Sequence, residues 1–408
     1  MSEKIEVVVV GGGYAGVMAA NRLTQRDDVA VTVINPRGSF VERIRLHQLV
    51  GGTDDAVTGF DAVLARGVEL VVDTVDLIDA GNRRVELSGG AALGYDYLIY
   101  AVGSGSAEPR VPGAAEFAYP IASLEQAQRL STTLAAARPD APVTVVGAGP
   151  TGIETAAELA EAGRHVTLIC GDVLGPYLHP RGRRAVARKL TALGVTILDG
   201  PDAKVVEVTR ETVRLSGGHR VRSAVTIWTA GFGVPRLAAH SGLRTDAVGR
   251  LLTDETLTSV DDPRIVAAGD SAAPSDLPFR MSCQAAGPLG AHAADTVLAR
   301  IAGATPAPVN LGFAGQCISL GRSGGIFQFA AKDDTAKWYH LRGRPGAKLK
   351  EFVCAHTIKQ LADEARTPGN HTWASDAGRK LVLQNRTDGP TLRHTAEHGR
   401  TRPTIAPR

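Results

Sequence analysis

Cysteine is scarce in this chain, with four residues among 408. Cys170, Cys283, Cys317 and Cys354 are widely separated, and no two of them form a C-x-x-C pair. This spacing is typical neither of a disulfide framework nor of a zinc site. We therefore expect no metal and no structural disulfide, and the composition fits best a protein of the reducing cytosol.

Long apolar runs are also missing, although hydrophobic residues make up an ordinary 44% of the chain. No stretch approaches the ~20 apolar residues that a membrane-spanning helix needs. The first residues pass directly into an expected strand, without the charged and apolar regions of a secretory signal. The sequence therefore predicts a cytoplasmic protein without a membrane span.

Aromatic residues account for only 5% of the chain, and the net charge is +3. Basic residues are mixed with acidic ones, and no basic run contains interleaved aromatics. A nucleic-acid partner is therefore not expected. The length, in contrast, is large for one hydrophobic core and favours two or three domains.

Glycine is abundant, and two glycine-rich stretches repeat one pattern. Residues 5–16 read IEVVVVGGGYAG, and residues 143–154 read VTVVGAGPTGIE. Each stretch begins with a β-branched run, typical of a buried parallel strand, and continues through G-x-G-x-x-G into helical sequence. The fingerprint glycines are Gly11, Gly13 and Gly16 in the first stretch and Gly147, Gly149 and Gly152 in the second.

These glycines have separate physical tasks in a dinucleotide-binding turn. The first permits a tight turn out of the strand, the second lets a pyrophosphate approach bare backbone, and the third lets helix and strand pack closely. The N-terminus of the helix then directs free N–H groups and partial positive charge at the phosphates. One such motif can be an ordinary glycine-rich turn, but two with complete strand–helix–strand context predict two nucleotide sites.

The remaining pattern predicts an α/β protein with two Rossmann-like dinucleotide-binding domains and a C-terminal α+β region. Residues 68–100 read as a strand meander that returns to the first sheet, and a proline-rich crossing segment follows at 109–120. From about residue 367 the sequence is polar and is expected to have little order. The expected division is 1–118 and 240–309 for the first nucleotide-binding domain, 119–239 for the second, 310–366 for a C-terminal domain and 367–408 for a tail.

Five stretches in this order resemble the pyridine nucleotide–disulfide oxidoreductase superfamily of flavoproteins. They are VVVVGGGYAG, YDYLIYAVGS, VTVVGAGPTGIE, TIWTAGFG and RIVAAGDSA. Within the superfamily the chain is most similar to type II NADH dehydrogenases and apoptosis-inducing-factor-like oxidoreductases. The resemblance covers roughly residues 5–360 and implies a glutathione-reductase-like fold. It also implies that the first site holds FAD and that NAD(P)H visits the second.

The resemblance implies specific residues for both cofactors. Asp270 is expected at the ribitol and phosphate region of FAD, Gly103 beside the flavin, and Gly231 where the second domain returns to the first. Glu154 corresponds to a glutamate that this family places near the nicotinamide and flavin rings, although a first-turn glutamate can also be a solvated helix acid. The full expected set is Gly11, Gly12, Gly13, Tyr14, Ala15, Gly16, Asn35, Arg43, Val75, Ala101, Gly103, Gly147, Gly149, Gly152, Cys170, Gly231, Gly269 and Asp270.

Two positions depart from the usual pattern for ribose recognition. A dinucleotide site usually has an acidic residue ~20 positions past its last glycine, and this chain has Asn35 and Cys170 there. Asn35 can still bond a hydroxyl, whereas Cys170 is a poor partner, and Asp172 follows two residues later. The choice between NADH and NADPH stays open, with a lean toward NADPH. Three arginines could reach its 2′-phosphate or form the solvated start of a helix: Arg181, Arg183 and Arg184.

Disulfide reductases of the superfamily carry a C-x-x-x-x-C pair after the second strand, and this chain lacks it. The matching stretch, residues 40–52, reads FVERIRLHQLVGG. The reduced flavin must therefore pass electrons directly to an external acceptor. Arg43 and His47 would share a helix face, where His47 could donate a proton and an arginine, Arg43 or Arg45, could stabilise an anion. The alternative is a surface helix with mixed charges.

The expected acceptor is a quinone or a quinone-like aromatic. Type II dehydrogenases line their quinone site with an A-Q-x-A-x-Q-x-G-like stretch, and residues 283–290 read CQAAGPLG. Gln284 and Gly290 match, whereas Pro288 replaces the second glutamine, so a different acceptor pocket stays open. The expected catalytic residues are Glu154, His47, Arg43, Arg45 and Gln284.

The sequence therefore predicts an FAD-dependent NAD(P)H oxidoreductase. Three other functions stay open: a reductase of a small electron-carrier protein, a flavin-dependent tailoring enzyme, and an NAD(P)H-sensing flavoprotein with little turnover. Residues 348–366 could form a helix on a membrane surface, but packing onto the body or onto a dimer partner is favoured. A peripheral contact with the inner face of the membrane and a homodimer also stay open.

Overall fold

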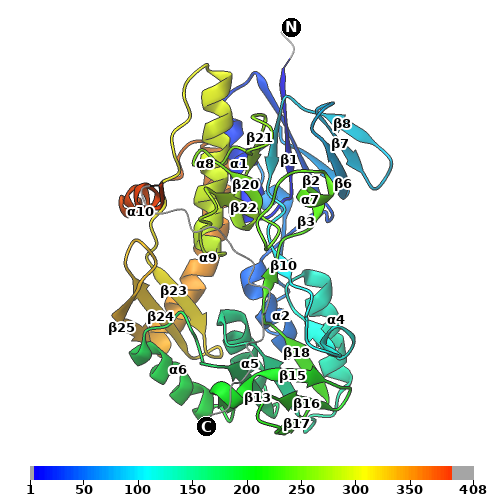
Figure 1. Ribbon diagram of the computed structural model, residues 1–408, viewed down its shortest axis with the longest axis vertical. Helices are drawn as coiled ribbons and strands as arrows, with labels where there is room; N and C mark the ends of the chain where they lie inside the picture. Colours follow the sequence, from blue (N-terminus) through cyan, green and yellow to red (C-terminus); the bar gives the residue numbers. More distant parts are fainter. Residues whose placement is uncertain (1–3, 388–408) are drawn as a thin grey trace, which may run out of the picture.

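Two parallel sheets form opposite ends of the molecule, and a smaller antiparallel sheet lies beside them (Figure 1). The computed structural model describes residues 4–387. Each parallel sheet has five strands and is built around one of the two glycine-containing strand–helix–strand units. The predicted α/β fold with two Rossmann-like sheets is confirmed.

The first sheet runs in the order β21-β9-β1-β2-β5, and every neighbouring pair is parallel. Its central strand β1 (Ile5–Val10) pairs Ile5 with Val29 of β2. Residues 7–10 are at most 4% exposed, so both faces of this valine run are covered, as a central parallel strand requires. The other strands are β2 (Val29–Asn35), β5 (Glu69–Val72), β9 (Tyr97–Tyr100) and β21 (Ile265–Ala267).

Two helices, α1 (Tyr14–Leu23) and α8 (Cys283–Ile301), pack tightly against each other beside this sheet. Their close approach depends on Gly290, because a Cβ atom there would lie 2.2 Å from the carbonyl oxygen of Ala15.

The predicted meander forms a separate antiparallel sheet before the chain returns at β9. Its strands are β6 (Val75–Asp79), β7 (Arg84–Leu87) and β8 (Ala92–Gly94). The segment after β2 contains β3 (Ser39–Val41), η1 (Arg43–Arg45), α2 (Leu46–Gly51), β4 (Val57–Gly59) and η2 (Phe60–Ala62).

The second parallel sheet has the order β11-β18-β12-β13-β14. The helix α4 (Leu124–Ala136) covers it and begins with a capping box formed by Ser123 and Gln126. The strands are β11 (Ala118–Pro120), β12 (Val143–Val146), β13 (Val166–Gly171), β14 (Thr196–Asp199) and β18 (Val225–Trp228). The remaining elements are α3 (Ala114–Phe117), α5 (Pro150–Glu161), α6 (Pro180–Ala192), η3 (Pro201–Ala203) and the antiparallel strands β15 (Val205–Val208), β16 (Thr212–Leu215) and β17 (Arg220–Arg222).

The chain crosses between the two sheets twice, and the crossing segments pair with each other. β10 (Gly105–Ser106) is antiparallel to β19 (Phe232–Gly233). After the second crossing, α7 (Leu237–His240) already contacts β6, so the chain rejoins the first sheet's domain just before residue 240. It continues through β20 (Leu251–Thr253), η4 (Gly269–Ser271) and β22 (Ala272–Pro274).

The C-terminal region consists of an antiparallel sheet and a long helix. The sheet contains β23 (Gly315–Ser319), β24 (Gly325–Ala330) and β25 (Ala336–Arg342), and α9 (Arg344–Arg366) follows. α9 contacts both this sheet and α1, and its Lys350 and Leu361 are buried. The helix therefore packs onto the body, as favoured from the sequence. In the described part of the chain, no helix combines the length and apolar character needed to cross a membrane.

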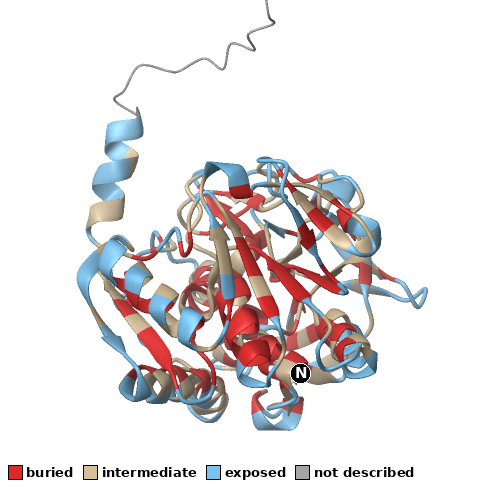
Figure 2. Cartoon of the chain, turned by 90° about the horizontal axis from the view of Figure 1, so that it is seen from below, coloured by how far each residue is buried: buried red, intermediate tan, exposed pale blue. Residues whose placement is uncertain are grey.

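The expectation of little order from residue 367 is wrong for residues 367–387. The backbone N–H of His371 donates to Glu364 at 2.7 Å, and the indole N–H of Trp373 donates to the carbonyl of Asn310 at 3.0 Å. The next element, α10 (Gly378–Thr387), is mostly exposed (Figure 2), but Arg379 in its first turn binds Glu255 and donates to the carbonyls of Leu277 and Pro274. The polar composition of this segment does not indicate these contacts, because the partners Glu364 and Asn310 lie outside it. Residues 388–408 of the expected tail lie outside the described residues.

Candidate active site

A cavity of about 1070 Å³ lies where the two nucleotide-binding domains and the C-terminal region meet. Its wall includes the first turns of both α1 and α5, so both glycine-rich turns lead toward one space. Cavities of this size at domain junctions are typical of ligand and cofactor sites. Of the residues expected from the sequence, the cavity wall contains Tyr14, Arg43, His47, Glu154, Gly231, Asp270 and Gln284.

The first glycine turn fits the pyrophosphate of FAD. Gly11 has a φ of +105°, and a Cβ atom there would lie 2.4 Å from the carbonyl oxygen of Ala101. A Cβ atom on Gly16 would lie 1.8 Å from the oxygen of Gly11. A Cβ atom on Gly13, in contrast, would meet no protein atom within 4 Å, and this residue caps α1 without any side-chain hydrogen bond. Bare backbone and free N–H groups therefore face open space, as a phosphate site requires.

Asn35 makes two backbone hydrogen bonds beside the first glycine turn, and its expected contact with a ribose hydroxyl stays a prediction. Its Oδ1 accepts from the backbone N–H of Gly12 at 3.0 Å, and its Nδ2 donates to the carbonyl of Arg37 at 2.7 Å. Asn35 thus fixes the conformation of the first glycine turn. The sequence pattern gave its position at the end of β2 but could not show these backbone partners.

Three polar side chains meet at the edge of the cavity next to the first turn. The Ser104 hydroxyl donates to Asp270 Oδ2 at 2.7 Å, and Arg43 Nη1 lies 3.2 Å from Ser104 Oγ and 3.8 Å from Asp270 Oδ2. Asp270 follows Gly269, whose φ is +66°. The structure therefore brings together the expected Arg43, Gly103, Gly269 and Asp270, and adds Ser104, a neighbour of Gly103.

The second glycine turn repeats the geometry of the first. Gly147 has a φ of +130°, and a Cβ atom on Gly152 would lie 2.0 Å from the carbonyl oxygen of Gly147. Gly149 faces open space and caps α5 without a side-chain hydrogen bond. The residues present therefore fit a second dinucleotide.

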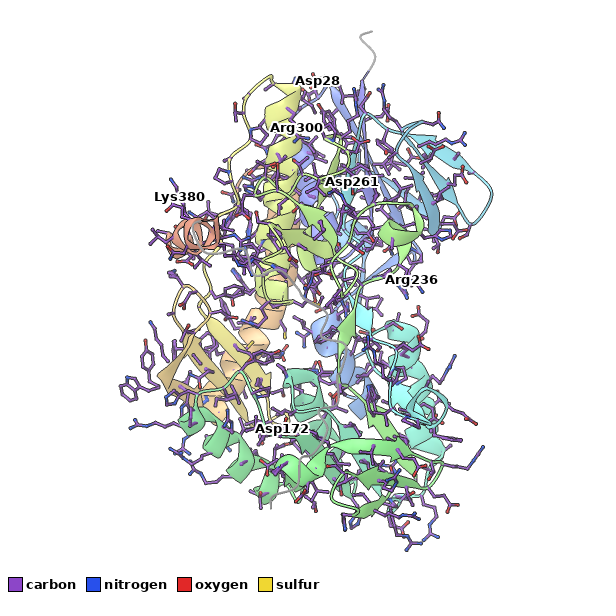
Figure 3. The ribbon with its side chains drawn as sticks, viewed as in Figure 1. Asp28, Asp172, Arg236, Asp261, Arg300 and Lys380 are labelled. Carbon is purple, nitrogen blue, oxygen red and sulfur yellow. The ribbon has the colours of Figure 1, made fainter. Side chains whose placement is uncertain are left out.

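Cys170 and Asp172 lie at the end of β13, where a ribose is usually recognised. Burial raises the pKa of the Cys170 thiol to about 12, so it is uncharged at neutral pH. Asp172, labelled in Figure 3, is exposed and lies 3.3 Å from Lys204 Nζ. The three arginines named above lie on α6, where Arg181 stacks over Trp338 at 5.1 Å and Arg183 donates to the carbonyl of Leu178.

A buried ion pair faces the cavity. Glu154 Oε1 lies 2.9 Å from Lys350 Nζ and accepts from the backbone N–H of Ser319 at 2.9 Å. Burial opposes the charged form of Glu154, but Lys350, His47 and the Ser319 N–H outweigh it and lower the pKa of the carboxyl. Burial likewise opposes the charge on Lys350, and Glu154 outweighs it and raises the pKa of the amine. Glu154 is thus no solvated helix acid, and both partners are charged at neutral pH.

His47 is buried, and its state differs from the expected proton donor. Its Nδ1 lies 3.7 Å from Glu154 Oε2, too far for a hydrogen bond, and its Nε2 has no partner. Burial lowers the pKa of His47 to about 4, even though Glu154 acts in the opposite direction. At neutral pH the residue is a neutral imidazole. The alternative of a surface helix is also wrong, because His47 is only 3% exposed.

Arg45 was expected beside the acceptor, but it points into a separate ion-pair network. Its guanidinium lies 3.0 Å from Glu42, 3.4 Å from Asp54 and 2.5 Å from Glu351, and it donates to Gln48 Oε1 at 3.0 Å. It does not line the cavity. Arg43 and Arg45 both belong to η1, where residues two positions apart point in different directions because the helix has three residues per turn.

Gln284 lines the cavity near the start of α8. Its amide faces the backbone of Ala314 and Gly315, with both amide atoms 3.0 Å from those groups. Pro288 is buried inside the same helix. Gln284 therefore ties α8 to the segment before β23 at the cavity wall.

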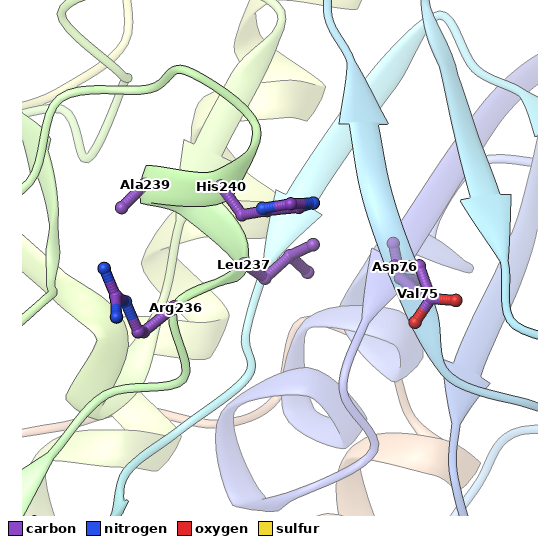
Figure 4. A pocket seen from close by; sticks show the side chains of 6 residues that line it. All are labelled: Val75, Asp76, Arg236, Leu237, Ala239 and His240. Atoms are coloured by element: carbon purple, nitrogen blue, oxygen red, sulfur yellow. The ribbon is translucent and has the colours of Figure 1, made fainter.

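Val75 lies away from this cavity. It lines a second, shallower cavity of about 720 Å³ between β6 and α7 (Figure 4). The other lining residues are Asp76, Arg236, Leu237, Ala239 and His240. Val75 thus lines a different cavity, and its expected contact with the cofactor stays a prediction.

Lys350 is the residue that the sequence analysis missed. The sequence showed it as one of several lysines flanking an amphipathic helix, which suggested a surface position. Its partner Glu154 belongs to another domain, so no local pattern signals the pair. The sequence offers one signal for this buried position, because Lys350 stands among the apolar residues of the helical pattern in 348–366.

Comparisons with known proteins agree with this geometry. A family model described as pyridine nucleotide-disulphide oxidoreductase matches residues 5–295. An NADH dehydrogenase-like protein of Mycobacterium tuberculosis is 34% identical over 323 residues, which cover 72% of this chain and 80% of that protein. A type II NADH:quinone oxidoreductase of the same organism is 31% identical, and the match covers 74% of each chain.

Two solved structures share the fold over most of their length. The sulfide:quinone oxidoreductase from Aquifex aeolicus has a TM-score of 0.75 at 18% identity, with 93% of this chain and 95% of that chain covered. NDH2 from Plasmodium falciparum in complex with NADH has a TM-score of 0.73 at 15% identity, with 90% and 99% covered. The matched family model spans more than half of the chain, and two relatives exceed 30% identity. The chain therefore belongs to the pyridine nucleotide-disulphide oxidoreductase family.

Proposed function

We propose that the chain is an FAD-dependent NAD(P)H oxidoreductase that delivers electrons to a quinone or a quinone-like acceptor. The names of the relatives, which include a type II NADH:quinone oxidoreductase, support this interpretation. The observation that carries it is the cavity shared by the first turns of α1 and α5, with the Glu154–Lys350 pair in its wall.

The glycine turns assign the two nucleotides to separate positions. The turn at residues 11–16, with Asp270, Ser104 and Arg43 beside it, would hold FAD. The turn at residues 147–152 would hold the nicotinamide dinucleotide. When bound at these turns, the flavin would supply the capacity to accept a hydride from the nicotinamide and to release two electrons to an acceptor.

The residues of the cavity wall would orient and stabilise the acceptor. Lys350 provides a positive charge in a water-poor site, where it can stabilise negative charge that develops on an acceptor oxygen. Glu154 keeps Lys350 charged and fixes its position. His47, as a neutral imidazole, adds a polar side chain to the cavity wall.

No thiol relay is needed for this reaction. The segment after β2 contains no cysteine. Cys283 and Cys317 line the cavity, but burial raises the pKa of both thiols, that of Cys317 to about 11. Protonated thiols are poor nucleophiles, so electrons would leave the flavin directly.

An acceptor dissolved in a membrane would require the protein to approach the bilayer. We therefore extend the proposal to a peripheral contact, supported by the exposed apolar side chains of Phe352 on α9 and of Leu381 and Val382 on α10. Sedimentation with vesicles would test this contact, and sedimentation equilibrium of the purified protein would test a homodimer.

Steady-state turnover with a panel of acceptors tests the proposal. The protein should release FAD on denaturation and should oxidise NADH or NADPH rapidly with soluble quinones. A preference for a ferredoxin-type carrier over every quinone would instead indicate a carrier reductase. Turnover close to zero with all acceptors, despite reduction of the flavin by NAD(P)H, would indicate a sensor.

A further inference from the structure

Two glutamates on α5 are both buried, but the proposed reaction uses only one of them. Glu154 and Glu158 are 6% and 3% exposed. They are four residues apart, so they lie on the same helix face one turn from each other. Glu154 lines the cavity, whereas Glu158 does not. A buried carboxyl group is costly unless it has partners or a task, so the position of Glu158 calls for an explanation.

Glu158 is connected to the protein surface by a hydroxyl group. Thr53, which follows the C-terminus of α2, is exposed and donates through Oγ1 to Glu158 Oε1 at 2.5 Å. Gly51 makes room for the carboxyl, because a Cβ atom there would lie 2.4 Å from Glu158 Cγ. One carboxylate oxygen of Glu158 is therefore one hydrogen bond away from bulk water.

Glu158 lies at the contact between α2 and α5, which contains polar atoms without a partner among the described residues. α2 packs along α5, with His47 next to Glu154 and Gly51 next to Glu158. Within residues 4–387, both Glu158 Oε2 and His47 Nε2 are buried without a partner. Buried polar atoms of this kind are usually satisfied by ordered water. The contact between α2 and α5 therefore has the groups needed to carry water between the two glutamates.

The charges around the two carboxyl groups push their proton affinities apart. Burial raises the pKa of Glu158, with Glu161 and Glu154 acting in the same direction and Thr53 and Arg322 opposing. The pKa of Glu154 is lowered, as described above. Glu158 thus keeps its proton to higher pH than Glu154. Such a difference in pKa between neighbouring carboxyl groups is found where one of them acts as an acid and the other as a base.

We propose that Glu158 is a proton-relay residue that connects bulk water at Thr53 with Glu154 at the cavity. The inference rests on the proposed function. A quinone takes up two electrons and two protons, whereas NAD(P)H supplies a hydride, which is two electrons and one proton. One further proton per turnover must come from water, and the net reaction is NAD(P)H + H⁺ + quinone → NAD(P)⁺ + hydroquinone. Glu158 acts through Glu154 and does not touch the acceptor.

The test compares acceptors that differ in their need for protons. In flavin-containing protein, Glu158→Gln should slow reoxidation of the flavin by a soluble quinone about tenfold. Reoxidation by ferricyanide, which takes electrons alone, and reduction by NAD(P)H should stay within about twofold of wild type. The solvent isotope effect on the quinone reaction should rise, because proton delivery becomes limiting. Thr53→Val, a surface change that leaves Glu158 in place, should give a smaller effect in the same direction.

Glu161→Gln is the matched control. Glu161 lies on the same helix but at the surface, where it accepts from Arg322 N and Ser323 Oγ and only adds to the raised pKa of Glu158. Its loss should therefore change the ratio of quinone to ferricyanide rates far less than Glu158→Gln does. An equal loss with both acceptors, or no loss, in Glu158→Gln would overturn the relay.

If wild type reduces ferricyanide but no quinone, the proposed function fails instead. Infrared spectroscopy then decides on Glu158: its carboxyl band, identified by its loss in Glu158→Gln and its retention in Glu161→Gln, should titrate at higher pH than an exposed glutamate, and titration at or below the pH of an exposed glutamate refutes the inference.

Discussion

Gly13 and Gly149 occupy equivalent places in the two nucleotide turns, and neither has a protein atom within 4 Å of a Cβ position. A valine at either place should therefore fold normally and project into the space of the pyrophosphate. We expect Gly13→Val to abolish flavin binding. Gly149→Val should retain the flavin but lose its reduction by NAD(P)H. The flavin absorbance of the purified variants and anaerobic reduction traces measure both effects, and loss of flavin from both variants would contradict the assignment.

His47 makes the stability of the protein sensitive to mild acid. Its pKa is about 4 in the folded state and about 6.5 in an unfolded chain. The unfolded state therefore binds the extra proton between these values, and stability falls as the pH drops from about 6.5 to about 4, by at most about 3 kcal/mol. His47→Gln should flatten this part of the pH profile of thermal unfolding. His240→Gln, at an exposed histidine, should leave the profile unchanged.

Cys170 determines the expected choice of nucleotide. Its uncharged thiol does not repel a 2′-phosphate, and Lys204 offsets the charge of the nearby Asp172. We expect both nucleotides to work, with a modest preference for NADPH. Cys170→Glu should shift the ratio of kcat/KM values toward NADH about tenfold, which is about 1.4 kcal/mol. A wild-type preference for NADH above ~100-fold would contradict this expectation.

At the scale of elements, the contact of α1 with α8 decides whether the first nucleotide turn keeps its shape. Gly290→Ala would place Cβ 2.2 Å from the backbone oxygen of Ala15, so the helices must separate. We expect a loss of about 1–3 kcal/mol of unfolding free energy together with weaker flavin binding. Gly287→Ala, one turn earlier in α8, is the control, because its nearest neighbour would be 3.8 Å away. Denaturant unfolding and flavin release of the two variants should differ clearly.

At the scale of the whole molecule, the segment after α9 has an anchored part and a projecting part. Most of α10 is exposed, but the Arg379 side chain is only 9% exposed and binds Glu255 at 2.8 Å as well as the carbonyls of Leu277 and Pro274. Truncation after residue 377 should therefore leave the flavin content unchanged and lower Tm slightly, through the loss of the Arg379 contacts. Truncation after residue 366 removes His371 and Trp373 from Glu364 and Asn310 and should lower Tm by several degrees. Equal Tm values for the two truncations would show that the contacts of residues 367–377 contribute little.

The sequence by itself determined the two nucleotide turns, their strands and helices, and the order of the domains. These features depend on contiguous residues: a β-branched run forms the strand, and glycines at fixed spacing permit the turn that follows. The positions of Gly11, Gly13, Gly147 and Gly149 could be predicted because their backbone requirements are local. The absence of a cysteine pair after the second strand was equally visible.

Tertiary structure alone decided the partners and the charge states of the side chains at the cavity. Lys350 meets Glu154 because α9 crosses to α5, and no local pattern encodes that crossing. Arg45 turns away to Glu42 and Glu351, and burial removes the charge from His47. Charge state and orientation depend on the desolvation and the partners that distant elements provide, so they are settled only when those elements pack together.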